Sequence, residues 1–256
     1  MDFGKNRVQF DNFEWFYFRF QRFDVYFYAG SRDIALLTAT IANSTLSETE
    51  NFFEHQLKQR IVFVVYQNLS DFRQSNIGLN TGDDQYNIGG VTKVIDNIAF
   101  LYIEEDITAY KKQVKSAIAS VFLNEMLYGS EISTKVANTT LINMPEWYND
   151  GLLKYVSTEW DSETENNTRN ALYAGKFDNL NQLSGSDAAI VGHAIWNYIA
   201  KTYGKQIIPN IVYLTRVTKN PESGFLYVLG ISMSMLQQNM TDFYEAQYGS
   251  FAVTTA

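Results

Sequence analysis

The chain contains no cysteine, and only two of its 256 residues are histidines. Without cysteine there can be no disulfide, no thiolate-bound zinc and no thiol nucleophile. His55 and His193 are the only imidazoles that could bind a metal or act as a general base. A zinc site in this chain would therefore be poor in nitrogen donors.

Basic residues are also scarce, because 20 Lys and Arg stand against 28 Asp and Glu, which gives a net charge of −8. A surface that binds nucleic acid needs a basic patch to face the phosphates, so nucleic acid is not expected as a partner. No apolar run approaches the roughly 20 residues that cross a bilayer, so the chain is not expected to be transmembrane. Residues 1–8 lack the apolar core of a signal peptide.

Several signatures of catalysis or ligand binding are missing. There is no Gly-x-Ser-x-Gly elbow for a serine nucleophile. The glycines at 82–90 are not followed by the Lys-Ser/Thr of a phosphate loop. The Asp and Asn residues at 80–87 do not have EF-hand spacing, so this segment is predicted to be a polar turn.

What the chain does have is 46% apolar residues and 15% aromatic residues, enough for a large core. Runs of β-branched and aromatic residues predict strands at 23–30, 60–67 and 98–103, with a helix over 33–59 and a loop over 74–92. From about residue 107 the apolar spacing is helical nearly to the end. The prediction is one α+β domain over 1–256, with a small mixed sheet in 1–106 and a helical lobe in 107–256.

Two details of these elements are uncertain from pattern alone. The helix over 33–59 is expected to break near Asn43 and Ser44, which are polar residues in an otherwise helical pattern. The aromatic segment 10–28 is predicted to be an edge strand or a hairpin packed on the core. A partner-binding surface is the alternative for that segment.

A helix over about 108–128 carries the most informative residue. Val114, Ile118, Val121, Glu125 and Tyr128 follow each other in steps of three or four, which places them on one helix face. Glu125 therefore points inward on an apolar stripe. Because an isolated buried carboxylate is costly, Glu125 must be paired, hydrogen-bonded or protonated. It is either a site residue or half of a structural ion pair.

The residues around Glu125 have the frame of H-E-x-x-H, with Asn124 and Tyr128 in place of the two histidines. Farther on, Trp147 begins the pattern Trp-x-Asn-Asp-Gly-Leu-x-x-Tyr. This resembles the second motif of the gluzincin metallopeptidases and of peptidase MA-like domains, which is close to Trp-x-x-Glu-Gly-Leu-Ala-x-Tyr. In that family the Glu is the third zinc ligand, and Asp150 occupies its position here.

Other parts of the chain fit the same family. The segment 191–204, which closes with Tyr-Gly, is similar to the helix that follows the site, and 221–244 is similar to the closing helices. The strands at 60–67 and 98–103 precede the motif helix, as in the family. The resemblance thus spans roughly 23–248 and implies a zincin-like fold.

The resemblance also implies that the metal site is degenerate. An amide oxygen such as that of Asn124 is a poor zinc donor, and the phenol of Tyr128 must lose a proton with an ordinary pKa of about 10 before it can bind zinc. Asp150 is one methylene shorter than the usual Glu. We therefore expect no zinc and no other cofactor, and without zinc the activated water of this mechanism is lost.

The expected function is that of a pseudo-enzyme, a non-catalytic module that binds a protein or peptide partner. Glu125 would be the vestigial general base, held by the Tyr128 hydroxyl or the Trp147 indole, with a cleft beside Trp147 and His193. The family resemblance further implies a bacterial, extracytoplasmic location in the periplasm or cell envelope.

Two alternatives stay open. The chain could be an active metal-dependent peptidase with a site rebuilt from Glu125, Asp150 and one histidine. A hard cation could bind to the oxygens of Asn124, Glu125 and Asp150. Of the histidines, His193 is predicted to be a hydrogen-bonded core residue and His55 a solvated surface residue.

Overall fold

The computed structural model describes residues 12–74, 93–104, 106–130, 139 and 141–249. The chain forms two compact units, one of Met1–Asn51 with Gln56–Phe122 and one of Phe52–His55 with Leu123–Ala256. The fold is mixed α+β, with a sheet in the first unit and helices in the second, as the sequence predicts. Most of the predicted loop, 75–92, lies outside the described residues.

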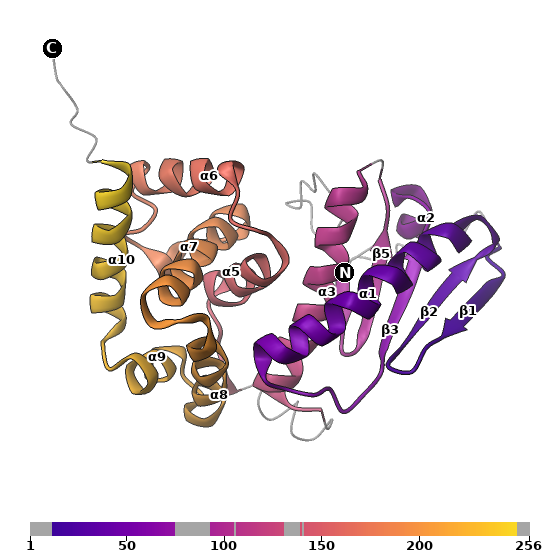
Figure 1. The fold of residues 1–256 in the computed structure, drawn as a ribbon, viewed down its shortest axis with the longest axis horizontal. Helices are drawn as coiled ribbons and strands as arrows, with labels where there is room; N and C mark the ends of the chain where they lie inside the picture. Colours follow the sequence, from indigo (N-terminus) through magenta and orange to yellow (C-terminus); the bar gives the residue numbers. More distant parts are fainter. Residues whose placement is uncertain (1–11, 75–92, 105, 131–138, 140, 250–256) are drawn as a thin grey trace, which may run out of the picture. The chain divides into compact units, whose positions relative to one another are not determined.

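The first unit contains a five-stranded mixed sheet (Figure 1). The strands are β1 (Trp15–Arg19), β2 (Phe23–Tyr28), β3 (Ile61–Tyr66), β4 (Lys93–Ile95) and β5 (Ile98–Tyr102). Their order is β1-β2-β3-β5-β4, in which β2, β3 and β5 are parallel and the two edge strands are antiparallel to their neighbours. The three predicted strands are the three parallel ones, whose long apolar runs reflect burial.

This unit also contains α2 (Leu69–Gln74) and most of α1 (Arg32–Phe53) and α3 (Ile107–Tyr128), whose last residues belong to the second unit. A hydrogen bond of 2.6 Å between the Thr38 and Tyr110 hydroxyls joins α1 to α3. The predicted break in α1 is wrong. Asn43 and Ser44 face solvent, and the Ser44 hydroxyl donates to the Ile41 carbonyl at 3.0 Å, so the helix accommodates both polar residues.

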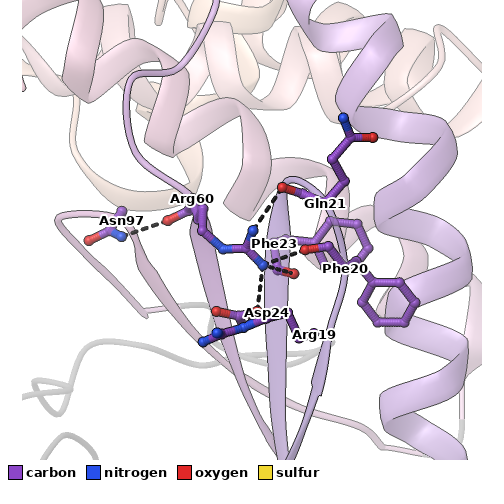
Figure 2. A network of polar contacts seen from close by, with 7 residues as sticks. All are labelled: Arg19, Phe20, Gln21, Phe23, Asp24, Arg60 and Asn97. Atoms are coloured by element: carbon purple, nitrogen blue, oxygen red, sulfur yellow. Dashed lines mark hydrogen bonds and ion pairs between the residues drawn. The ribbon is translucent and has the colours of Figure 1, made fainter.

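The hairpin of β1 and β2 confirms the prediction of an edge strand for the aromatic segment. The connection between β1 and β2 is held by Arg60, the residue directly before β3 (Figure 2). The Arg60 guanidinium donates to the carbonyls of Phe20, Gln21 and Phe23 and to the Asp24 carboxylate at 2.6 Å. The Arg60 side chain thus bonds to the backbone carbonyls of this turn, which the sequence pattern alone does not predict.

The second unit is helical. Its helices are α5 (Glu146–Ser157), α6 (Ser162–Tyr173), α7 (Gly185–Tyr203), α8 (Ile208–Thr218), α9 (Pro221–Leu229) and α10 (Met233–Tyr248). A hydrogen bond of 3.0 Å from the Trp196 indole to the Tyr148 carbonyl joins α7 to α5. None of the helices in the described part of the chain is long and apolar enough to cross a membrane.

The α5 and α7 helices approach each other at two glycines. A Cβ on Gly192 would lie 2.0 Å from the Trp147 carbonyl oxygen, and a Cβ on Gly151 would lie 2.3 Å from the Gly192 backbone. No side chain larger than hydrogen fits at either position unless the helices move apart. Gly151 of the second motif is therefore required by packing, whatever its relation to a metal site.

Candidate functional site

All six residues singled out from the sequence belong to the second unit. Asn124, Glu125 and Tyr128 lie on the last turns of α3, Trp147 and Asp150 on α5, and His193 on α7. The helical assignments of both motifs are therefore confirmed. Asn124 is half-buried beside Glu125.

Glu125 is the inward-pointing carboxylate that its helix position predicts. Its side chain is 10% exposed, and its Oε1 accepts a hydrogen bond of 2.9 Å from Nε2 of His55. The expected partners were Tyr128 and Trp147, so this pairing was missed. His55 is half-buried and engaged in this contact, not a freely solvated residue.

Burial raises the pKa of Tyr128, although the neighbouring side chain of Asn149 in the second motif acts in the opposite direction. The Oδ1 of Asn149 is buried and has no hydrogen-bond partner among the described residues. Because a phenol binds a metal as phenolate, a raised pKa makes Tyr128 a worse metal ligand than an ordinary tyrosine.

Asp150 lies half-buried one residue farther along α5. Burial, and then the negative charge of Glu146 on the same helix, raises the pKa of Asp150 to about 6. A bound cation would act in the opposite direction. Within the described residues, no three His, Cys, Asp or Glu side chains are grouped so that they could hold a metal ion.

Trp147 is buried, and its indole N–H donates to Asn181 Oδ1 at 3.3 Å rather than to Glu125. Asn181 lies in the short 3₁₀ turn Leu180–Gln182, which pattern reasoning did not single out. Trp147 also stacks on Phe225 of α9, with ring centroids 6.0 Å apart. Its partners therefore differ from that of Glu125, which pairs with His55.

His193 is the most deeply buried of the six, with 1% of its surface exposed. Its ring meets the edges or faces of Tyr155 and Trp160 at centroid distances of 5.9 and 5.1 Å. Burial, and then the positive charge of Lys154, lowers the pKa of His193 to about 3. The core location is confirmed, but Nδ1 has no hydrogen-bond partner in the described residues, so the ring is an apolar-packed neutral imidazole.

The predicted site residues have different partners: Glu125 pairs with His55, Trp147 contacts Asn181 and Phe225, and His193 packs against Tyr155 and Trp160. The chain matches no protein-family model, and no curated protein matches it. The gluzincin resemblance therefore remains a prediction from the motifs.

Proposed function

We propose that the chain is a non-catalytic, peptidase-like module: a gluzincin scaffold that has lost its zinc and binds a protein or peptide. The observation that carries this proposal is the hydrogen bond between Glu125 and His55 at 2.9 Å. The side chain at the general-base position is engaged with another protein group instead of being free to polarise a water. An extracytoplasmic location belongs to the same proposal and rests on the family resemblance alone.

The electrostatics of the ligand positions support the proposal. Zinc is held by deprotonated donors, so a ligand set should have lowered pKa values once the metal is bound. Burial raises the pKa of the Tyr128 phenol, so this group would have to lose its proton at extra cost to bind zinc. Burial and the charge of Glu146 raise the pKa of Asp150 to about 6, so this carboxyl is harder to ionise than an ordinary aspartate.

The first test is the zinc content of protein purified without chelator. The proposal predicts well under one zinc per chain and no zinc-dependent cleavage of peptides. About one zinc per chain would defeat it, because a catalytic site of this type depends on its metal.

A second test addresses the proposed relation to the gluzincin family. The double change Asn124→His, Tyr128→His should create zinc affinity if Asp150 can complete the site, since two imidazoles and a carboxylate are an ordinary ligand set. The matched control is Lys111→His with Lys115→His, the same spacing earlier on α3. Zinc affinity no higher than that of the control, in a folded protein, would show that Glu125 and His55 form a structural pair without a zincin relation.

One observation favours the alternative of an active hydrolase with a rebuilt metal site. A histidine does reach Glu125, and His55 is one of only two in the chain. That alternative predicts stoichiometric metal and a loss of both metal and activity in His55→Gln. The metal content of the unaltered protein therefore decides between the two functions.

A further inference from the structure

A cavity of about 510 Å³ opens in the second unit, away from the residues that pair with Glu125. It is formed where the first turns of α5, α9 and α10 meet the end of α8 and the turn Leu180–Gln182. Its volume falls within the range of roughly 300–1,000 Å³ that is usual for ligand sites. All the residues that line it are described and belong to the second unit.

One side of the cavity is apolar. Trp147 and Phe225, which are stacked on each other, form its wall together with Met233 at the start of α10. The two aromatic residues are almost completely buried and form the floor, so the apolar surface open to a ligand comes from half-buried Met233 and exposed Leu141. Such a surface favours an aliphatic or aromatic group, and the methionine thioether adapts to its shape.

The rim of the cavity is polar and carries both charges. Asn143 and Asn181 contribute exposed amides. Because the Trp147 indole donates to Asn181 Oδ1, the Nδ2 group of that amide is left to donate outward. Lys219 and Glu222 offset each other in charge, so the rim does not favour a strongly charged ligand such as a phosphate.

Lys219 adds a backbone observation at the same rim. Its φ is 59°, in the left-handed region that a residue with a side chain adopts at a cost. It ends α8 there, directly before the cap of α9 at Asn220. A glycine would adopt this backbone conformation at lower cost.

We propose that this cavity binds a peptide segment by taking up one aromatic or large aliphatic side chain, while the rim amides bond to the neighbouring peptide groups. An amide side chain offers one acceptor and donors in the same arrangement as a peptide group, which is why Asn residues suit this ligand. The inference rests on the proposed function for the ligand class, and it adds the place and the side chain recognised.

The probe is a set of capped pentapeptides of glycine and serine with phenylalanine, leucine, glycine or aspartate at the centre. Nuclear magnetic resonance can follow the indole N–H signals of the 4 tryptophans. The Phe and Leu peptides should shift the Trp147 signal saturably, because that N–H lies at the cavity wall. The glycine and aspartate peptides should not. Equal shifts by all four peptides, or none by any, would overturn the proposal.

Matched variants test the location. Met233→Trp should fill the cavity and weaken binding of the Phe peptide by about tenfold or more, whereas Met235→Trp, on the same turn but outside the lining, should change it less than about twofold. Equal effects of the two substitutions would contradict the assignment.

Failure here is distinguishable from failure of the proposed function. Peptide binding that survives Met233→Trp but is lost in Glu125→Gln would reject this cavity and keep the peptide-binding module. Stoichiometric zinc with binding lost in Met233→Trp would reject the non-catalytic module and keep the cavity. A saturable shift of the Trp147 signal by a disaccharide, with none by the peptides, would reject the ligand class.

Discussion

At the scale of single residues, the surroundings of Asp150 lower the stability of the folded protein at neutral pH. Burial and the charge of Glu146 raise its pKa to about 6, above the ordinary value of 3.8. The folded protein therefore binds a proton here between about pH 3.8 and 6, where the unfolded chain does not, and stability from this group is lost as pH rises through that window.

Asp150→Asn should accordingly raise the free energy of unfolding at pH 7.5 by about 1–2 kcal/mol, discounted for partial solvent screening, and change it little at pH 4. Urea unfolding at the two pH values measures this. The control is Asp178→Asn, which alters an exposed residue of the same unit and should leave the free energy of unfolding unchanged at both pH values. A gain of the same size at both pH values would show that the carboxylate is not perturbed by its surroundings.

His193 has the opposite pH dependence. Its pKa of about 3 in the folded state lies below the ordinary 6.5, so only the unfolded chain takes up this proton as pH falls from about 6.5 towards 3. The native state therefore loses stability over that range, by at most about 1.4 kcal/mol per pH unit from this one group.

His193→Phe, which retains a ring between Tyr155 and Trp160, should flatten the fall in unfolding free energy between pH 6 and pH 4. His193→Asn should flatten it as well, because it also removes the titrating group, even if it costs packing. Curves parallel to that of the unaltered protein in both variants would mean that His193 is charged, or solvated, in the folded state.

The residue scale is also where sequence reasoning reached its limit. The helical face of Glu125 was readable from spacing, and the need for a partner followed from burial. The identity of that partner was not readable, because His55 stands 70 residues earlier in the chain. No periodic pattern links two such positions, and only the packing of the second unit brings them together.

At the scale of elements, the crossing of α5 and α7 depends on two glycines. In a helix interior, Gly→Ala normally stabilises by roughly 1 kcal/mol through lower backbone entropy in the unfolded chain. At Gly192 the added methyl would lie 2.0 Å from the Trp147 carbonyl oxygen. Gly192→Ala should therefore destabilise by about 3 kcal/mol or more, in the unfolding free energy measured by urea. A stabilising effect would disprove the close approach.

The β1–β2 hairpin depends on one side chain in a comparable way. Arg60→Met removes the donors to three turn carbonyls and to Asp24, and should cost about 1–3 kcal/mol. Although burial alone would raise the pKa of Asp24, hydrogen bonds and charges from Arg60 and Arg19 hold it below its ordinary value, so a carboxyl titration should show it rising in the variant.

Arg22→Met is the matched control, since Arg22 forms a surface pair with Glu50 and its loss should cost under about 1 kcal/mol. Equal losses of stability in the two variants, with the Asp24 titration unmoved, would show that Arg60 is an ordinary surface residue.

The ends of elements were generally harder to predict than their interiors. Neither α2 nor β4 is predicted from the sequence, because a six-residue helix and a three-residue strand are too short for periodicity to show.

At the scale of the whole molecule, the division into a sheet-bearing front and a helical back could be predicted because the apolar period changes near residue 107, where α3 begins. The unit boundary lies elsewhere, between Phe122 and Leu123 inside that helix, since compactness depends on contacts that the period does not encode. The same holds for the site: the motif helices were predicted, whereas the partners of their side chains, His55 for Glu125 and Asn181 for Trp147, were not.

The outer strand β1 has a consequence for handling the protein in solution. Trp15, Phe16 and Tyr17 are 39%, 42% and 51% exposed, on a strand that ends the sheet of the described residues. An exposed edge strand with aromatic side chains favours pairing between copies of the chain, and the like charge of the copies opposes this pairing. Turbidity should therefore rise sharply as pH approaches the isoelectric point near 4.8, and Phe16→Lys should suppress it. The excess of carboxylates would then prevent aggregation through the exposed edge strand only while those groups stay ionised.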